Sequence, residues 1–176
     1  METTLRYKRD DLLEWVIRYM TKLGVPADDA KIVGNVLICA DIRGVESHGL
    51  HRLGSYYGSR ISKGWIDPLT PYKIIQETAT TALIDGGNGC GQVVSHKAMK
   101  LTIDKAKASG LGAVTVRNSN HFGIAGYYAM MAMKQGMIGL AFTNSQPLVA
   151  PTYGCTAVLG TNPIAVAVPA GSQRPY

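Results

Sequence analysis

The chain has 176 residues, of which 46% are hydrophobic and 17% charged, so it is long and apolar enough to bury one core or two small ones. A net charge of +6 is compatible with a nucleic-acid partner, but the basic residues are scattered and form no contiguous stripe. We therefore expect no nucleic-acid partner. A small anionic substrate suits a mildly basic protein equally well.

Three cysteines, Cys39, Cys90 and Cys155, lie far apart and form no C-x-x-C pair. Their odd number and wide spacing indicate neither a disulfide framework nor a metal site, and they are typical of a reducing, cytoplasmic environment. The N-terminus lacks an apolar signal core, and no apolar run reaches the roughly 18 residues of a membrane helix. We therefore expect a cytoplasmic protein with no membrane contact.

The front of the chain is predicted to be helical. Apolar residues recur at helical spacing over residues 12–23, and Gly24 is a suitable end for that helix. Pro26 is expected to begin a second helix that runs toward Arg43. Ser47 is expected to cap a third helix that continues to Ile61.

A boundary is predicted at residues 64–72, where Gly64, Pro68 and Pro71 interrupt the pattern. It separates a helical segment, residues 1–70, from a mixed α/β segment, residues 71–176. The expected strands of the second segment are residues 73–76, 81–85, 113–117, 138–143 and 164–168, with a β candidate at Val158, and the expected helices are residues 92–109 and 125–135.

The expected fold class is α+β, with the helical segment followed by a mixed, non-Rossmann sheet and helices. The strand at residues 164–168 is apolar enough for a core, yet only eight residues follow Val168. We therefore expect the chain to be a fragment of a larger fold, with an incomplete second segment.

His48, Arg52 and Tyr56 are spaced by four and would share one face of the third helix. A guanidinium pairs with a carboxylate through two parallel hydrogen bonds, and imidazole and phenol groups donate to a hydroxyl or ketone oxygen. The pattern thus favours a site for a small carboxylate. A solvated helix surface capped by Ser47 explains the same residues.

His121 lies in the segment N118-S-N-H-F-G123, between an expected strand and an expected helix. Loops at the carboxyl ends of strands often hold ligands, and a histidine titrates near neutral pH, which suits acid–base catalysis. A histidine that hydrogen-bonds its own loop is the alternative.

Three further loops carry groups that suit a cofactor. The segments T143-N-S-Q-P147 and G160-T-N-P163 combine small polar residues with proline, and G86-G-N-G-C-G-Q92 resembles a phosphate cradle. The last segment lacks G-x-G-x-x-G because Gln92 stands at the final position, so a Rossmann site is not supported. Ordinary turn chemistry explains each loop taken alone. No cluster of metal ligands is apparent.

The helix expected at residues 92–109 carries several basic residues that look like one solvated face. The residues expected on the surface are Lys97, Lys100, Lys105, Lys107 and His96.

In this order, the motifs resemble those of the malate/L-lactate dehydrogenase family, whose nicotinamide site is not of the Rossmann type. The matching stretches are A40-D-I-R-G-V-E-S-H-G-L-H-R52, G86-G-N-G-C-G-Q92, S119-N-H-F-G123, N144-S-Q-P147 and G160-T-N-P163. The resemblance covers the chain from end to end but only the front half of the family's members, whose cofactor site also draws on their second half.

The resemblance implies a role for each matching residue. His121 corresponds to the proton-transferring histidine, Arg52 to the carboxylate anchor and His48 to a substrate contact, with Ser47 and Tyr56 at less certain substrate-side positions. The residues that it places at the cofactor are Ser145, Asn162 and Pro163.

The function expected from this resemblance is hydride transfer between NAD or NADP and the 2-hydroxy or 2-oxo group of a small carboxylic acid. Family members are usually homodimers, which implies the same here. Because half of the family's length is unmatched, an inactive truncated paralogue or an interaction module remains the alternative.

Overall fold

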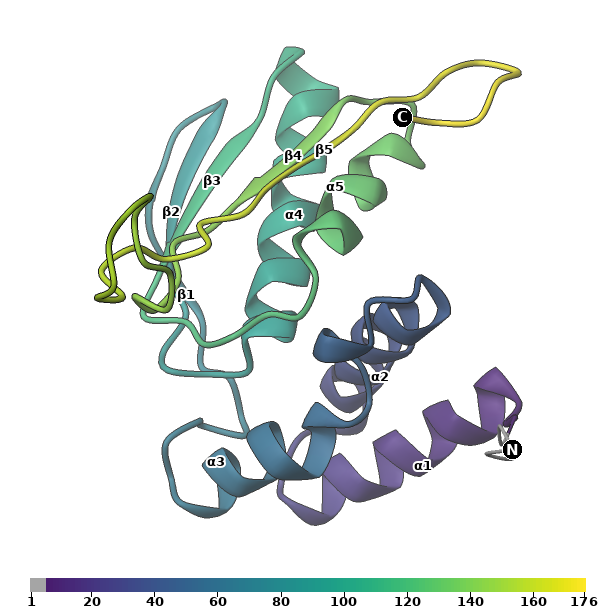
Figure 1. Cartoon of the computed structure of the whole chain (residues 1–176). Helices are drawn as coiled ribbons and strands as arrows, with labels where there is room; N and C mark the ends of the chain where they lie inside the picture. The colour runs from purple at the N-terminus through teal and green to yellow at the C-terminus, as the bar shows by residue number, and fades with distance from the viewer. Residues whose placement is uncertain (1–5) are drawn as a thin grey trace. The chain divides into compact units, whose positions relative to one another are not determined.

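The computed structural model describes residues 6–176, and the chain divides into two compact units, Met1–Ile124 and Ala125–Tyr176 (Figure 1). The first unit contains both helices and strands: α1 (Arg9–Lys22), α2 (Ala27–Ile42), the 3-10 helix η1 (Glu46–His48), the π-helix η2 (Leu53–Gly58), α3 (Ser59–Ser62), β1 (Lys73–Glu77), β2 (Thr81–Asp85), α4 (Gly91–Ser109) and β3 (Ala113–Arg117). The second unit contains α5 (Ala125–Met133), β4 (Gly139–Phe142) and β5 (Ile164–Ala167). The expected α+β class is confirmed.

Helices α1 and α2 pack through their apolar sides. Val16 and Met20 of α1 share a buried core with Val33 and Leu37 of α2. Acidic residues occupy the first turn of each helix, where they complement the helix dipole, and Gly24 ends the α1 turn at φ +89°. The first two predicted helices are confirmed.

The third predicted helix is wrong as a continuous element. An extended residue, Gly49, separates η1 from the later helical turns, and the chain then forms a π-helix before the short α3. The cause is the Asp41 carboxylate at the end of α2. It accepts the Leu50 N–H at 2.9 Å and lies so close to Gly49 that a Cβ there would overlap it. Ser47 makes no cap.

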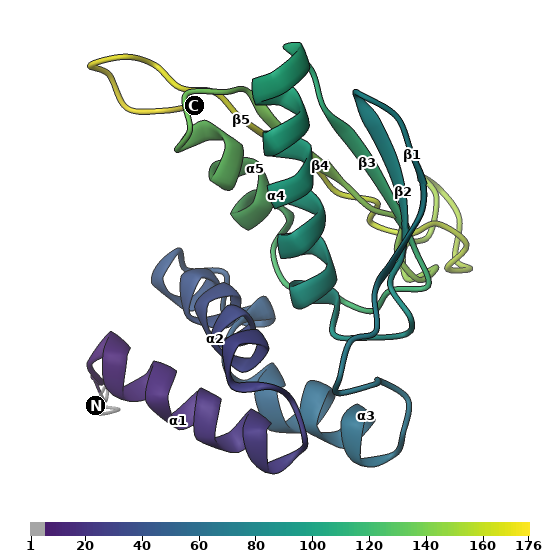
Figure 2. The ribbon, with the colours of Figure 1, turned by 180° about the vertical axis from the view of Figure 1, so that it is seen from behind.

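The sheet of the first unit has the order β1-β2-β3, with β1 antiparallel and β3 parallel to β2. Helix α4 connects the parallel pair and lies along the sheet, as both ribbon views show (Figures 1 and 2). Ile84 of β2 packs with Val94 and Ala98 of α4. Because β2 and β3 are parallel, the loops that follow them leave the sheet at the same edge.

These two loops lock together through close backbone contact. The Asn120 amide nitrogen donates to the carbonyl oxygens of Asn88 and Gly89 at 3.0 Å. A Cβ on Gly91 would lie 2.1 Å from the Asn120 oxygen, so only glycine fits there. Close packing against neighbouring chain therefore explains the glycines of this segment, and a phosphate cradle there stays a prediction.

Helix α4 is more buried than its basic residues suggest. Lys105 is only 8% exposed, and its Nζ pairs with Glu77 at 2.8 Å and donates to the Thr78 oxygen at 2.6 Å. Lys97 pairs with Asp29 at 3.3 Å, and the His96 Nδ1 is buried. The expectation of a solvated face is therefore wrong for Lys105, and it holds only in part for His96, whose side chain is half-buried.

In the second unit, β4 and β5 form an antiparallel pair in which Gly139 lies opposite Ala167 and Phe142 opposite Ile164. Both strands pack against α5. The β candidate at Val158 is limited to a single bridge between Val149 and Leu159. No helix within residues 6–176 combines the length and apolar character needed to cross a membrane.

Replacing Gly91 with Ala should destabilise the chain, because the new methyl group meets the Asn120 backbone rather than a movable side chain. Overpacking of this kind typically costs about 1–3 kcal/mol. The matched control is Gly126→Ala on α5, where no atom lies within 4 Å and the free energy of unfolding should stay level or rise. Urea unfolding of both variants measures the difference, and equal stabilities would contradict the close-contact explanation.

Candidate active site

The turn after α2 sets the first half of the candidate site. Asp41 fixes the chain at Gly49 and Leu50, between the residues of interest. The Arg52 Nε donates to the Ser47 carbonyl oxygen, and the Ser47 hydroxyl lies 2.9 Å from the His48 Nδ1. These bonds hold the guanidinium and the imidazole on one compact turn.

His121 supplies the second half from the loop that follows β3. Its ring stacks on the His48 ring with centroids 5.2 Å apart, and the Tyr56 ring lies at 5.3 Å. The Tyr57 hydroxyl lies 2.6 Å from the His121 Nδ1. Residues distant in the sequence therefore meet in one aromatic and basic cluster.

Two hydrogen-bonding groups face the Nδ1 atom of His121. The Gly123 N–H approaches Nδ1 at 3.3 Å and can only donate, which suits a neutral ring with its proton on Nε2. The Tyr57 hydroxyl, at 2.6 Å, can donate to Nδ1 or accept from it, so it also suits the tautomer with the proton on Nδ1. Because both groups lie at Nδ1, Nε2 is the nitrogen left to face a ligand.

The electrostatic surroundings favour the neutral form of His121. Burial, followed by the positive charge of Arg52 and smaller effects of His48 and Arg60, lowers the pKa of His121 to about 4. Burial and Arg52 also lower the pKa of His48. At neutral pH both imidazoles are uncharged, and an uncharged imidazole is able to accept a proton.

The Tyr56 ring lies against two guanidinium groups. The Arg52 Cζ is 5.6 Å and the Arg60 Cζ 4.1 Å from its centroid, within the range of cation–π attraction. Two cations beside a neutral histidine create a positive environment that suits an anionic ligand.

The predicted substrate-side residues thus come together, although the helical face that was predicted to join them does not exist. Ser47, His48, Arg52, Tyr56 and His121 form one cluster. Sequence reasoning missed Tyr57 and Arg60. Only the long-range contact with His121 reveals Tyr57, and nothing in its sequence neighbourhood distinguishes it from Tyr56.

The predicted cofactor-side residues meet separately, in the second unit. The Ser145 N–H donates to the Asn162 Oδ1 at 3.0 Å, the Ser145 hydroxyl accepts the Thr161 N–H at 2.9 Å, and the Thr143 N–H donates to the Pro163 oxygen at 3.3 Å. These exposed hydroxyl and amide groups fit the neutral parts of a nicotinamide cofactor, its carboxamide and ribose. Thr161 belongs to the predicted G160-T-N-P163 segment but was not among the residues assigned to the cofactor.

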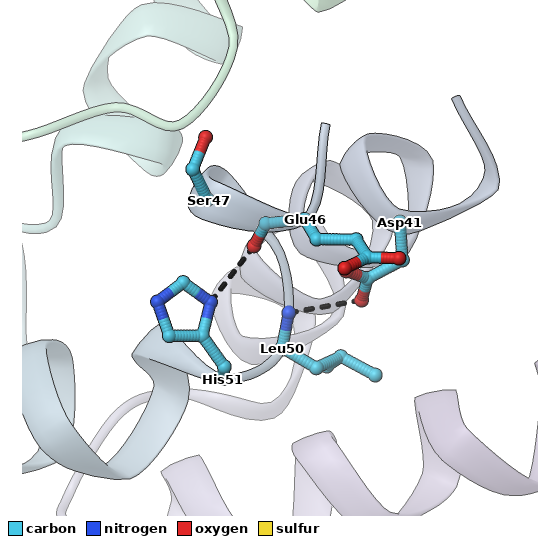
Figure 3. A pocket seen from close by; sticks show the side chains of 5 residues that line it. All are labelled: Asp41, Glu46, Ser47, Leu50 and His51. Atoms are coloured by element: carbon cyan, nitrogen blue, oxygen red, sulfur yellow. Dashed lines mark hydrogen bonds between the residues drawn. The ribbon is translucent and has the colours of Figure 1, made fainter. Parts of the chain in front are cut away.

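A hollow of about 510 Å³ lies on another side of the same turn (Figure 3). It is lined by Asp41, Glu46, Ser47, Leu50 and His51. The two carboxylates would repel an anion, and His51 binds the Glu46 carbonyl oxygen at 2.8 Å. A carboxylate ligand is therefore better placed beside Arg52 and His121 than in this hollow.

Comparison with known proteins identifies the family. A family model described as malate/L-lactate dehydrogenase matches residues 7–176. The chain belongs to this family. The resemblance found in the motifs is thereby confirmed.

Individual relatives of the family are similar in sequence and in structure. The chain is 56% identical over 168 residues to a malate dehydrogenase of Pyrococcus abyssi, covering 96% of this chain and 46% of that protein. It is 50% identical over 152 residues to an L-sulfolactate dehydrogenase of Methanocaldococcus jannaschii, covering 86% of this chain and 44% of that protein. The solved malate dehydrogenase of Pyrococcus horikoshii matches with a TM-score of 0.95 and 52% identity, over 100% of this chain and 50% of that one. The chain spans about half the length of these relatives.

The lowered pKa of His121 should make stability depend on pH. The unfolded chain binds a proton at this residue below about pH 6.5 and the folded chain only below about 4, so acid favours the unfolded state between these values. The free energy of unfolding should therefore fall as the pH decreases through this window. A His121→Gln variant should lose stability less steeply, as followed by thermal denaturation at a series of pH values. Parallel curves for the two proteins would contradict the lowered pKa.

Proposed function

We propose that the protein is an oxidoreductase that transfers a hydride between NAD or NADP and the 2-hydroxy or 2-oxo group of a small carboxylic acid. The observation that carries the proposal is the cluster of a neutral His121 with His48 and the Arg52 guanidinium. Membership of a family whose relatives include malate and sulfolactate dehydrogenases supports it.

Arg52 is proposed to anchor the substrate carboxylate. The bond from its Nε to the Ser47 oxygen fixes the plane of the guanidinium, and the terminal nitrogens make no hydrogen bond in the part of the chain that the structure describes. A fixed guanidinium plane suits paired hydrogen bonds to the two oxygens of a carboxylate.

His121 is proposed as the general base in oxidation and the general acid in reduction. In the tautomer that carries its proton on Nδ1 and donates it to the Tyr57 oxygen, the free Nε2 would take the substrate hydroxyl proton. The resulting imidazolium would return this proton in the reverse reaction. His48, stacked on His121, would donate to the same substrate oxygen or complete the pocket, and Ser47 and Tyr56 would line the substrate side.

Binding of an anion should also raise the pKa of His121, the proposed base. In the free protein, Arg52 and Arg60 help to lower the pKa of His121 to about 4, a value that makes a weak base. A bound carboxylate supplies an opposite charge nearby, which raises the pKa of an imidazole. The substrate would thus strengthen the base that acts on it.

Ser145, Asn162 and Pro163, together with Thr161, are proposed to contact the nicotinamide cofactor through the carboxamide or ribose. The bound nicotinamide supplies the hydride acceptor or donor of the reaction. Residues 71–176 would form the cofactor domain and residues 1–70 the helical segment before it. By analogy with the family, we also propose that the protein works as a homodimer in the cytoplasm.

The direct test measures nicotinamide absorbance of the purified protein with NAD or NADP and a panel of L-malate, L-sulfolactate and L-lactate. The proposal predicts oxidation of at least one of these acids. A parallel cofactor titration by nicotinamide fluorescence addresses the alternative: absence of both turnover and cofactor binding would favour an inactive paralogue or an interaction module.

Replacing Arg52 with Lys keeps the charge but removes the planar pair of donors. Because a hydrogen bond to a charged group contributes roughly 1.5–3 kcal/mol, the KM for the acid should rise about 10- to 100-fold. Steady-state kinetics measure the change, with Arg18→Lys on the exposed side of α1 as a matched control. Unchanged kinetics in the Arg52 variant would show that this residue is not the anchor.

Replacing His121 with Ala removes the proposed acid–base group. The value of kcat should fall by about 10²–10⁴ while cofactor binding in the fluorescence titration is retained. His51→Ala is the control, because His51 binds the Glu46 carbonyl oxygen and faces the hollow. A His121→Ala protein with normal turnover would remove the central assignment.

A further inference from the structure

The proposed reaction leaves one half-buried cation beside the candidate site without a ligand. Arg60, on α3, lies over the Tyr56 ring with its Cζ 4.1 Å from the ring centroid, closer than the Arg52 Cζ at 5.6 Å. The Arg60 Cζ is also 5.5 Å from the ring centroid of Trp65. Its guanidinium therefore contacts two aromatic rings, one of which also contacts His121.

This stacking leaves the hydrogen-bond donors of Arg60 free. A guanidinium on an aromatic face directs its N–H groups outward in its own plane, where they can bind an anion. Within residues 6–176, the Arg60 guanidinium makes no hydrogen bond and no ion pair, and the terminal nitrogens of Arg52 make none either. Two guanidinium groups with free donors thus lie beside one tyrosine ring.

Two other cations that the fold takes out of water are paired. Lys97 and Lys105 each contact a carboxylate of a neighbouring element, at 3.3 and 2.8 Å. A cation that is partly desolvated without a partner costs free energy, so a purely structural role would favour pairing of this kind. The substrate carboxylate proposed for Arg52 supplies one missing partner, and Arg60 still lacks its own.

Arg60 is close enough to His121 to influence its protonation. Burial and the charges of Arg52 and His48 lower the pKa of His121 to about 4, and the charge of Arg60 adds to their effect. Both guanidinium groups therefore act on the imidazole that is proposed to exchange the proton. A small acid that binds Arg52 and contacts His121 would have Arg60 within its reach.

We propose that Arg60 binds a second acid group of the substrate and thereby makes the site selective for dianionic 2-hydroxy acids over monoanionic ones. Arg52 holds the carboxylate next to the reacting carbon, and Arg60 holds the acid group at the other end of the molecule. The inference rests on the proposed function, because it refines the substrate class of the same site.

Support of the Tyr56 ring is the other role that the contacts of Arg60 allow. A cation–π contact stabilises the position of the ring without any ligand. The two roles differ in their effect on substrates, because the loss of a support affects every acid that binds beside Tyr56. The loss of an anion contact affects only acids that carry the second charge. A matched pair of acids therefore separates the two roles.

The kinetic test compares kcat/KM for L-malate and for L-lactate in the unsubstituted chain and in Arg60→Gln. The readout is the ratio of the two values, because any effect of the substitution on Tyr56 or His121 is common to both acids. Loss of a hydrogen bond to a charged group should lower this ratio about 10- to 100-fold in Arg60→Gln. An unchanged ratio would overturn the inference.

Lys63→Gln is the matched control for the loss of a positive charge. Lys63 is an exposed neighbour whose Nζ lies 5.0 Å from the ring centroid of Trp65. Because solvent and salt screen an exposed charge, its removal should leave the ratio of kcat/KM for the two acids unchanged. A fall of the ratio as large as that in Arg60→Gln would show that long-range attraction, and not binding by Arg60, selects the dianion.

A binding measurement makes the test independent of turnover. Succinate and butyrate share a chain of four carbons and differ by one carboxylate, and neither has a hydroxyl group to oxidise. NMR of the whole chain labelled with ¹⁵N-histidine follows the His121 signals as each acid is added at constant ionic strength. The unsubstituted chain and Lys63→Gln should bind succinate at least about 10-fold more tightly than butyrate, and Arg60→Gln should bind both with similar affinity.

The two measurements distinguish failure of this inference from failure of the proposed function. A preference for succinate that Arg60→Gln removes, without oxidation of any acid, supports the second anion contact and contradicts the dehydrogenase proposal. Oxidation with an unchanged ratio in Arg60→Gln does the reverse. If circular dichroism shows that Arg60→Gln is unfolded, Arg60→Lys replaces it and should lower the same ratio to a smaller extent. An unsubstituted chain that does not prefer succinate would overturn the inference whatever the variants do.

Discussion

A single hydrogen bond, between the Tyr57 hydroxyl and the His121 Nδ1, ties together two segments that lie 64 residues apart in the sequence. Tyr57 comes from the helical region and His121 from the loop after β3, so the bond fixes that loop against η2. His48, Arg52 and Tyr56 are near His121 because they belong to the same helical region. The candidate site depends on this contact more than on any local motif.

Two supports keep the bond in place. On the helical side, the Asp41 carboxylate accepts a hydrogen bond from the Leu50 N–H, and the helical conformation is interrupted at Gly49. This interruption turns His48 and Arg52 toward His121. On the sheet side, the parallel pairing of β2 and β3 brings the two following loops together, and Asn120 binds one to the other. Both supports are made of backbone polar groups satisfied by side chains, as buried or half-buried turns require.

Much of the fold could be predicted because it follows from local patterns. The helices α1, α2 and α4 and the strands β2 and β3 appear close to the predicted bounds, where apolar periodicity and glycine or proline punctuation agree. The prediction of a continuous third helix was wrong because helical spacing does not reveal the Asp41 carboxylate that interrupts it. The prediction that Lys105 is exposed was wrong because its partner Glu77 lies on a strand 28 residues away in the sequence.

In the candidate site, too, residues within local motifs could be predicted and residues joined only by long-range contacts could not. The motifs placed Ser47, His48, Arg52, Tyr56 and His121, and the structure brings them together. Tyr57 carries no local signal, since a buried partner becomes visible only through long-range packing. The roles of these residues in a reaction stay predictions, as do those of Ser145, Asn162 and Pro163 in the second unit.

We propose that an anionic substrate binds beside Arg52, where its negative charge raises the pKa of His121. The most direct measurement is the pKa of His121, read by NMR, with and without saturating oxamate in the presence of reduced cofactor. Oxamate has a carboxylate beside a carbonyl group that hydride does not reduce. The account predicts that oxamate raises the pKa above the value of about 4 in the free protein. Binding of oxamate that leaves this pKa unchanged would contradict it.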